Sequence, residues 1–376
     1  MSNIPELLVS LSGEKIDTIE KWEKFRRGEV KDLLSEYIYG FRDIERPENL
    51  YFEIKEETVF KGMRKKEVIC GFNDFSFPFT IYLPQGTSKP LATFLFIFTQ
   101  NPEKNSKFDE KGNLVWVPEN ADEIRDGAHV IPVKDVTERG FAIALMPTRN
   151  VYPDWQAHAE FKQGVFAAYK PLKPRTNNSW AGISAWSWGA ERIMDYFETD
   201  KDIDEKNVAV LGFSRGGKAA LWTAACDERF KLSVSDNSGC AGAAMHRGKQ
   251  GEHIKDINIS DWFCDNYHGF DDNEEMLPVD QHMLISLIAP RYVYVTSSQD
   301  DLWSDPEAEY RSCKLATPAF ELYGVKGLVC EDEKPPFEKP CHDGHIAYHM
   351  KWGEHSLGTY DWEKAMDYFE KIIKEN

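Results

Sequence analysis

The sequence contains a serine whose neighbours could make it a nucleophile. Residues 212–216 read Gly-Phe-Ser-Arg-Gly, at the end of the apolar run 208–212 and before a segment of good helix formers. In this strand–turn–helix order the turn strains the serine backbone, and the flanking glycines let strand and helix approach closely. The helix N-terminus and the backbone N–H of Arg215 would face a developing oxyanion. We therefore predict that Ser214 performs acyl transfer as a nucleophile, rather than serving as a plain turn residue.

Such a serine needs a histidine as base and a carboxylate that orients the histidine. After the apolar run 291–296, the sequence Ser-Ser-Gln-Asp-Asp-Leu-Trp-Ser-Asp contains Asp300, Asp301 and Asp305. We predict Asp301 as the acid and keep Asp300 as the alternative, because sequence does not fix which side chain faces inward. Any of the three could instead be a solvated turn or helix-capping aspartate.

In proteins with a serine on this kind of strand–turn–helix turn, the catalytic residues follow in the order serine, acid, histidine. The base is therefore expected on a loop just before a final amphipathic helix. His355 has this position, whereas His345 and His349 precede the end of the expected loop and are weaker candidates. His282 follows Asp280 at a spacing without a partner cluster, so we predict a buried structural histidine there. The mechanism needs neither a metal nor another cofactor.

The segments around these residues alternate between buried strands and helices. Continuous apolar runs are typical of strands buried on both faces, and they lie at 91–98, 141–146, 208–212 and 291–296. Helical segments lie at 182–198, 216–226 and 281–288, and antiparallel strands are expected between 50 and 83. This pattern predicts the α/β-hydrolase fold, a three-layer α/β sandwich with a mostly parallel sheet. The second oxyanion donor is expected around Thr99 and Gln100, after the first of these runs.

The chain also divides in a simple way along its length. Helical spacing over 14–40 predicts an N-terminal helical segment, residues 1–45, packed on the body. Residues 46–376 are expected to form a single catalytic domain. The stretch 239–280 is rich in Gly, Asp and His, so we predict an insertion there, outside the sheet.

Composition limits the partners. The net charge of −18 disfavours nucleic acid and anionic membrane surfaces, which attract basic patches. No run of 18 apolar residues exists, and the N-terminus does not resemble a signal peptide. The seven cysteines show no CxxC spacing. We expect a reduced, cytoplasmic protein, with a removed leader left open and no prediction of the oligomeric state.

Several blocks resemble carbohydrate esterase family 15, the glucuronoyl esterases, particularly the bacterial branch often labelled acetyl xylan esterase. The resemblance runs over most of the chain, and Ser-Arg-Gly-Gly-Lys at 214–218 is its most specific part. Further blocks lie at 185–190, 238–244, 277–284, 287–291, 301–303 and 360–362. The resemblance implies hydrolysis of a carbohydrate ester through an acyl-enzyme on Ser214.

The resemblance also implies roles for four other residues. Arg215 would help to stabilise the oxyanion, Lys218 would contact sugar hydroxyls, and Glu252 in the following loop would also bind the sugar. Trp303 would pack against a uronic acid. Without the resemblance, Lys218, Glu252 and Trp303 would be interpreted as a surface charge, a loop charge and a core aromatic, respectively.

Two departures separate this sequence from the fungal members of that family. They carry the acid in a Glu-Ser-Gly sequence just after the next strand, where this chain has Asn237. They also have a disulfide near the serine and histidine, whose two positions are here Phe213 and Ser356. The first departure supports Asp301, and the second agrees with a reduced compartment.

Three functions follow. The first is hydrolysis of a uronic acid ester, and the alternative is deacetylation of acetylated xylo-oligosaccharides on the same scaffold. The third is a catalytically silent binding protein, disfavoured by the intact serine, aspartate and histidine candidates. In the first two, the partner is a small-molecule or oligosaccharide ester.

Overall fold

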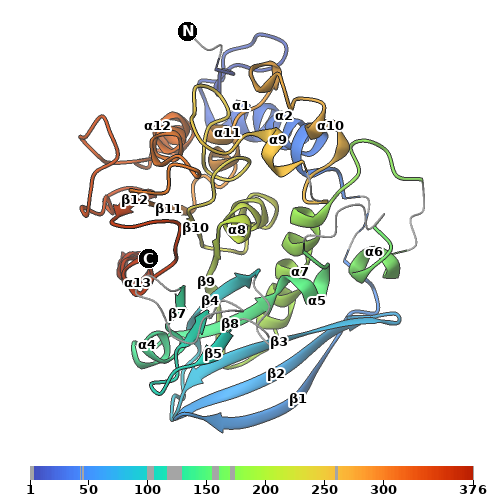
Figure 1. Cartoon of the computed structure of the whole chain (residues 1–376), viewed down its shortest axis with the longest axis vertical. Coiled ribbons are helices and arrows are strands. Elements are labelled where there is room, and N and C mark those ends of the chain that lie inside the picture. The colour runs from blue at the N-terminus through green and yellow to red at the C-terminus, as the bar shows by residue number, and fades with distance from the viewer. Residues whose placement is uncertain are drawn as a thin grey trace.

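The computed structural model describes most of the chain, namely residues 4–42, 44, 46–99, 106–116, 129–154, 161–169, 174–258 and 261–375. Its centre is a nine-stranded sheet, with strand order β1-β2-β3-β8-β4-β9-β10-β11-β12 within these ranges (Figure 1). A separate three-stranded sheet shares a core with Phe96 of β4 and consists of β5 (Ser106–Phe108), β6 (Leu114–Trp116) and β7 (Val130–Ile131). The small sheet was not predicted, because its strands are too short to show a period.

The larger part of the main sheet is parallel. Its strands are β8 (Ala142–Pro147), β4 (Leu91–Phe98), β9 (Ile203–Phe213), β10 (Leu232–Asp236), β11 (Tyr292–Ser298) and β12 (Ile346–Lys351). Each pairs in parallel with its neighbour, so their carboxyl ends meet at one edge. In open α/β sheets this edge carries the ligand site. Strands β10 and β12 were not among the predicted runs.

The remaining strands are antiparallel, as predicted for residues 50–83. They are β1 (Tyr51–Phe60), β2 (Met63–Phe72) and β3 (Phe75–Pro84). Each pairs antiparallel with the next, and β3 pairs antiparallel with β8.

Helices cover both faces of the parallel strands. Along β4, Leu95 and Ile97 face one core, while Phe94 and Phe96 face the other. This alternation is what a strand buried on both faces requires. The first core is covered by α7 (Gly182–Phe197), α8 (Arg215–Cys226), α11 (Gln281–Ser286) and α12 (Pro306–Leu322), and the second by α4 (Val133–Glu138) and α13 (Thr359–Glu375). The arrangement is a three-layer sandwich.

A helical segment precedes the sheet and packs on the first core. It runs through α1 (Ile19–Lys21), a π-helical turn (Trp22–Arg26), α2 (Arg27–Leu34) and a second π-helical turn (Ser35–Tyr39). It starts later than predicted, because Thr18 caps the first turn and Ile16 pairs with Leu8 through a backbone hydrogen bond. Gly40 ends it, with φ +80°.

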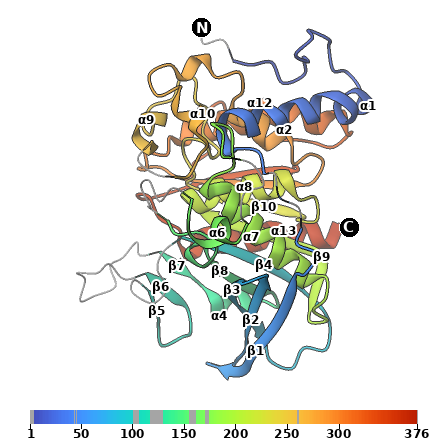
Figure 2. The same cartoon turned by 90° about the vertical axis from the view of Figure 1, so that its right-hand side faces the viewer.

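Short helices fill the remaining loops. Between β8 and α7 lie α5 (Thr148–Val151) and α6 (Gly164–Ala168). The stretch between β10 and α11 carries α9 (Ile254–Ile257), α10 (Asp265–His268) and a 3-10 turn (Glu274–Met276), and none of them joins the sheet. Figures 1 and 2 place α10 beside α2, and α9 at the same end of the molecule, opposite β1.

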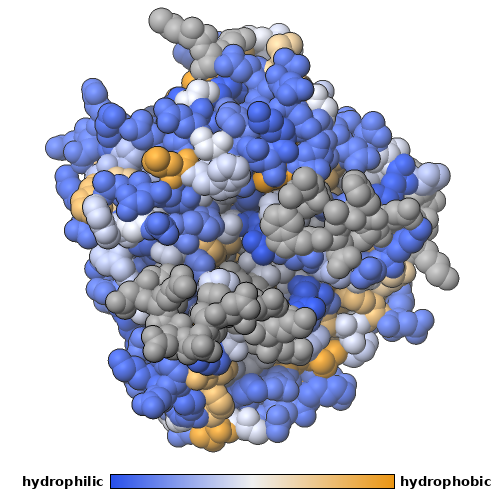
Figure 3. Space-filling model, in the orientation of Figure 1, coloured by the Kyte–Doolittle hydropathy of each residue, from blue (hydrophilic) through white to orange (hydrophobic). Residues whose placement is uncertain are grey.

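One face of the described surface is mostly polar (Figure 3). Figure 3 shows hydrophilic residues over most of one face, with only small separated hydrophobic spots. Among the described helices, none is both long enough and apolar enough to cross a membrane. All seven cysteines are free thiols. In the part of the chain that the structure describes, no three His, Cys, Asp or Glu side chains are grouped as a metal site would need.

Candidate active site

Ser214 lies on a strained turn between β9 and α8. Its backbone has φ +55° and ψ −127°, a conformation that non-glycine residues rarely adopt. A Cβ atom on Gly212 would lie 2.0 Å from the carbonyl oxygen of Gly216, so this turn requires glycine. The Ser214 N–H donates to the Asp236 carbonyl oxygen at 2.8 Å, which ties the turn to β10. The strain holds a half-buried hydroxyl at the carboxyl edge of the sheet.

The surroundings of this turn suit a developing oxyanion. Helix α8 begins at Arg215, so its positive dipole end and free N–H groups lie next to the Ser214 hydroxyl. Thr99, which follows β4, lies close to the same turn, because a Cβ on Gly216 would be 3.3 Å from its methyl group. The second predicted donor position, Gln100, lies outside the described residues.

Asp301 and His355 face each other across the loops after β11 and β12. His355 Nδ1 lies 2.6 Å from Asp301 Oδ2, and the Ser304 N–H donates to Asp301 Oδ1 at 3.1 Å. Burial by itself would raise the pKa of Asp301, but the contacts with His355 and Ser304 outweigh it and keep the pKa below its usual value. Asp300 is exposed, and Asp305 caps α12 through the Ala308 N–H.

His355 also lies close to the nucleophile turn. The His355 and Phe213 rings are 4.5 Å apart between centroids, and Phe213 immediately precedes Ser214. The two side chains Ser214 and His355, both described, share no hydrogen bond in this structure. In unliganded enzymes this contact is often long and tightens when substrate binds.

The other predicted histidine candidates lie elsewhere. His345 Nδ1 is 2.6 Å from the Pro290 carbonyl oxygen. His349 is buried within β12, where Nδ1 lies 2.6 Å from the Tyr294 hydroxyl. Neither contacts Asp301. His282 is buried beside the Pro5 carbonyl oxygen at 3.1 Å, as a structural histidine would be.

Lys218, in the first turn of α8, meets Glu252, which also contacts Trp303. The Lys218 ammonium group is buried and donates to Glu252 Oε2 at 2.8 Å, as well as to the Cys240 carbonyl oxygen. The Trp303 indole N–H donates to Glu252 Oε1 at 3.2 Å, while 54% of this residue remains exposed. A buried charge pair next to an exposed aromatic ring offers polar groups and a flat apolar surface to one ligand.

Arg215, which directly follows Ser214, is held by a separate set of contacts. Its guanidinium Nε donates to Asp154 Oδ2, and its charge lies 5.6 Å from the centre of the Trp262 ring. The Trp262 indole N–H donates to the second oxygen of Asp154 at 2.8 Å. These contacts fix a cation near the Ser214 turn.

Sequence reasoning missed the residues that hold these loops together. Asn237 has φ +44°, and its side-chain oxygen accepts the Ser298 N–H at 2.7 Å. Its amide group donates to Asp236 Oδ1 at 2.7 Å and to the Ser356 carbonyl oxygen at 3.2 Å. Asn237 therefore joins the loops after three strands, at the position where the fungal pattern carries its acid.

Glu309, on α12, is a second missed support. One oxygen accepts the N–H groups of Ser238 and Gly239 at 2.8 and 2.9 Å, and the other accepts the Ser297 hydroxyl at 2.6 Å. Complete burial raises the pKa of Glu309 to about 8. The sequence contains only a weak signal for the structural role of Glu309, because a single glutamate on a helix normally faces solvent.

His129 is the third missed residue. The centroid of its ring lies 4.5 Å from that of Phe213, and the His355 ring contacts Phe213 at the same distance. Its Nδ1 accepts the Leu357 N–H at 3.2 Å. Burial, together with the nearby charge that His355 can carry, lowers the pKa of His129 to about 4. His129 is therefore a neutral support for the His355 loop.

The chemistry available at this edge belongs to the class of serine hydrolases with the α/β-hydrolase fold, because the Ser214 hydroxyl, the His355–Asp301 pair and the N–H groups at the start of α8 lie there. Comparisons with known proteins give the same answer. The model of the family described as "Glucuronyl esterase, fungi" matches residues 140–324. This range includes Ser214 and Asp301.

Individual relatives match almost the whole chain. A carbohydrate esterase, MZ0003, from an unknown prokaryotic organism is 33% identical over 391 aligned residues, covering 97% of this chain and 88% of the relative. A promiscuous CE15 esterase from a marine bacterial metagenome has a TM-score of 0.85 at 31% identity, covering 98% and 97% of the two chains. A glucuronoyl esterase from Solibacter usitatus has a TM-score of 0.86 at 29% identity, covering 98% of each.

The chain belongs to carbohydrate esterase family 15, the glucuronoyl esterase family. The predicted resemblance is therefore confirmed, as are the predicted α/β-hydrolase fold and the assignment as a carboxylic ester hydrolase.

Proposed function

We propose that this enzyme hydrolyses the ester of a uronic acid, with Ser214, His355 and Asp301 as its catalytic triad. The observation that carries the proposal is that a buried Lys218–Glu252 pair contacts Trp303, with Lys218 in the first turn of α8, four residues after Ser214. The Asp301–His355 pair lies next to this group, because Ser304, which follows Trp303, contacts both Asp301 and His355. A sugar beside Trp303 would present its carboxyl ester to the serine.

The proposed reaction has two steps. His355 Nε2 takes the proton of the Ser214 hydroxyl as its oxygen attacks the ester carbonyl, and the N–H of Arg215 stabilises the resulting oxyanion. His355 then protonates the departing alcohol, and the uronic acid remains as an ester on Ser214. Water, deprotonated by His355, releases it. Asp301 keeps the imidazole oriented through Nδ1 and stabilises its charged form.

The sugar-binding assignment rests on matching chemistry. Glu252 and Lys218 supply an acceptor and a charged donor for sugar hydroxyls. The exposed Trp303 ring supplies a flat apolar surface for the sugar C–H groups. The relatives named as glucuronoyl esterases support a uronic acid as the acyl part of the substrate.

The alternative is a carbohydrate deacetylase, in which the sugar would be the leaving alcohol instead of the acyl part. One similar structure is described as a promiscuous CE15 esterase, and this description supports the alternative. Both activities would use Ser214, so only the choice of substrate separates them.

The test is to assay the wild type and Ser214→Ala on benzyl glucuronate and on 4-nitrophenyl acetate. We expect faster turnover of the glucuronate ester, and a loss on the order of 10⁴ to 10⁶ in kcat for the variant. Cleavage of acetate alone would support the deacetylase. Absence of Ser214-dependent turnover on both esters would contradict the proposal and favour the silent binding protein.

We also propose the predicted division of the chain, with a helical segment at 1–45 and one catalytic domain at 46–376 that carries an insertion around 239–280. The continuous core that joins the N-terminal Trp22 and Leu34 with Val210 of the sheet supports the packing of this segment on the catalytic domain.

A further inference from the structure

Two of the seven cysteines lie at the ends of one loop between α12 and β12. Cys330 begins this loop and Cys341 ends it, and both are free thiols in this structure. Residues 331–340 between them are rich in proline and charged residues and form neither a helix nor a strand. Because such a segment has little regular backbone hydrogen bonding, side-chain contacts must hold it in place.

The edge of the sheet fixes the position of Cys341. This residue pairs antiparallel with Tyr348 of β12, through hydrogen bonds of 2.8 Å from the Cys341 N–H and 3.1 Å from the Tyr348 N–H. Directly opposed residues of such a pair point their side chains to the same face of the sheet. The Tyr348 ring packs against that of Tyr310 on α12, with the centroids 4.8 Å apart. The Cys341 thiol therefore lies on the α12 face of β12.

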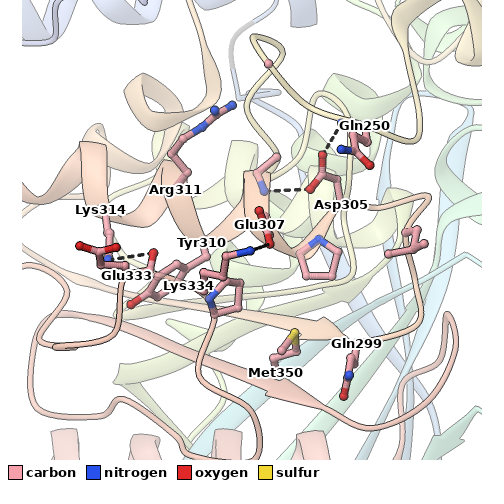
Figure 4. Close-up of a pocket in the computed structure, with 15 residues that line it drawn as sticks. Gln250, Gln299, Asp305, Glu307, Tyr310, Arg311, Lys314, Glu333, Lys334 and Met350 are labelled. Atoms are coloured by element: carbon pink, nitrogen blue, oxygen red, sulfur yellow. Dashed lines mark hydrogen bonds and ion pairs between the residues drawn. The ribbon is translucent and has the colours of Figure 1, made fainter.

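Helix α12 also holds the segment that follows Cys330. The Tyr310 hydroxyl donates to the Asp332 carbonyl oxygen at 2.7 Å, and the Lys314 ammonium group donates to the Glu333 carbonyl oxygen at 3.3 Å. Figure 4 shows Tyr310 and Lys314 of α12 beside Glu333. Since Asp332 is only two positions after Cys330, Tyr310 helps to fix both ends of the loop.

The two ends of the loop also contact each other. Lys339 Nζ lies 3.3 Å from Asp332 Oδ2. The Cys330 thiol lies 3.8 Å from the same carboxylate oxygen, and the Cys341 thiol lies 4.0 Å from the Lys339 carbonyl oxygen. The two thiols therefore flank one ion pair from opposite ends of the loop. This pair is exposed to solvent, so on its own it stabilises the loop little.

The two thiols are close enough to influence each other. Burial, and after it the Cys330 side chain, raise the pKa of Cys341 to about 12. Burial and Cys330 also raise the pKa of the Tyr310 hydroxyl. A disulfide requires Cβ atoms about 3.5–4.5 Å apart, and interacting thiols on facing segments can reach this distance by rotation of their side chains. Cys330 is half-buried and Cys341 is buried, so an oxidant reaches Cys330 first.

We propose that Cys330 and Cys341 form a disulfide in the presence of a small-molecule disulfide such as oxidised glutathione, and that this bond stabilises the fold by closing the loop. A bond between the two ends restricts the unfolded chain, which is the usual source of such stabilisation. The inference is independent of which ester the enzyme hydrolyses.

The reaction consists of two thiol–disulfide exchanges. Cys330, as a thiolate, attacks one sulfur of oxidised glutathione, whose S–S bond breaks, and one glutathione leaves with the proton that Cys330 lost. The Cys341 thiol then loses its proton and attacks the Cys330 sulfur, which expels the second glutathione. The two cysteines together lose two electrons and two protons, and oxidised glutathione gains them.

The experiment treats the folded protein with oxidised glutathione, blocks the remaining thiols with N-ethylmaleimide under denaturing conditions, and counts them by intact mass. Cys330→Ser should keep all six of its thiols. Cys341→Ser should stop at a glutathione bound to Cys330, because no second thiol can displace it. Cys226→Ser is the matched control, because Cys226 is also half-buried but lies outside the loop, and it should still form the disulfide.

In the wild type, we expect the number of free thiols to fall by two, from seven to five, and a non-reduced digest to link the peptides containing Cys330 and Cys341. The melting temperature should rise by about 2–5 °C on oxidation, and Cys330→Ser should show no rise. Seven free thiols, a bond between other cysteines, or a stable glutathione on Cys330 of the wild type would overturn the pairing. A linked pair without a higher melting temperature would overturn the stabilising role.

Discussion

The neighbouring strands β10 and β11 each bring a buried aspartate to the carboxyl edge of the sheet, and the two carboxyl groups differ in charge. Asp236 is the last residue of β10, and burial together with the nearby Asp361 carboxylate raises its pKa to about 8. Asp301 follows β11, and its contacts with His355 and Ser304 overcome the effect of burial and lower its pKa. Near neutral pH, Asp236 is therefore largely protonated and Asp301 is ionised.

The difference follows from their partners. Asp236 accepts hydrogen bonds from the Thr296 hydroxyl at 2.5 Å and from the Asn237 amide at 2.7 Å, both neutral donors. Asp301 faces an imidazole that can carry a positive charge. A triad acid must stabilise an imidazolium, so only the carboxylate with this partner suits the role. Asp236 instead holds the nucleophile turn through its backbone carbonyl oxygen, which accepts the Ser214 N–H.

The largest expected effect is that of Asp301→Asn. This variant keeps the size of the side chain but removes the charge that orients and stabilises the His355 ring, so kcat should fall by about 10³ to 10⁴. Steady-state kinetics on benzyl glucuronate measures this fall. The control is Asp300→Asn, which changes the exposed neighbour and should stay within about twofold of the wild type. Equal losses in both variants would remove the distinction between the two aspartates.

Glu252→Gln should have the next largest effect, and only on sugar esters. It removes the charge that pairs with the buried Lys218 ammonium group and accepts from Trp303. A hydrogen bond to a charged group contributes about 1.5–3 kcal/mol, so kcat/KM for a glucuronate ester should fall by about 10- to 100-fold. The rate on 4-nitrophenyl acetate serves as the comparison, and a parallel fall there would point to damage at Ser214 instead of lost sugar binding.

Trp303→Ala should have a smaller effect of the same kind. Because the ring is 54% exposed, its removal leaves the core intact and removes only a binding surface. Aromatic contacts contribute about 0.5–1.5 kcal/mol beyond their area, so KM for the glucuronate ester should rise by about two- to tenfold with little change in kcat. A fall in kcat with unchanged KM would contradict this role.

Asp236→Asn should change activity least and should reveal itself in stability. The unfolded aspartate ionises near pH 4, whereas the folded group keeps its proton up to about pH 8. Between these values the folded state binds more protons, so raising the pH destabilises the wild type. The variant lacks this loss, and its free energy of unfolding relative to the wild type should rise by roughly 1–3 kcal/mol from pH 5 to pH 8. Urea unfolding at both pH values measures it, and an unchanged difference would mean that Asp236 is ionised in the folded state.

Sequence alone predicted the parts of the molecule with local signals. The Ser214 turn is marked by glycines that steric contact requires, and helices α7 and α8 are marked by their periodicity. The choice between Asp300 and Asp301 could not be made, because adjacent loop residues differ only in which way the fold turns them. The structure buries Asp301 against His355 and leaves Asp300 exposed.

The residues that sequence reasoning missed depend on contacts between distant segments. Glu309 is separated from Ser238 by 71 positions, and His129 from Leu357 by 228. No spacing rule links such pairs, since each has meaning only after the strands have placed their loops together. Asn237 was identified as the residue at the fungal acid position, but its role in joining three loops was not predictable.

Covalent labelling tests most directly whether His355 activates the strained Ser214. A fluorophosphonate reacts with activated serines, and intact-mass and peptide analysis locate the added group. We predict a single phosphonyl group on the peptide containing Ser214 in the wild type, no addition in Ser214→Ala, and much slower addition in His355→Asn. Labelling of another residue, or an unchanged rate in His355→Asn, would contradict the assignment of nucleophile and base.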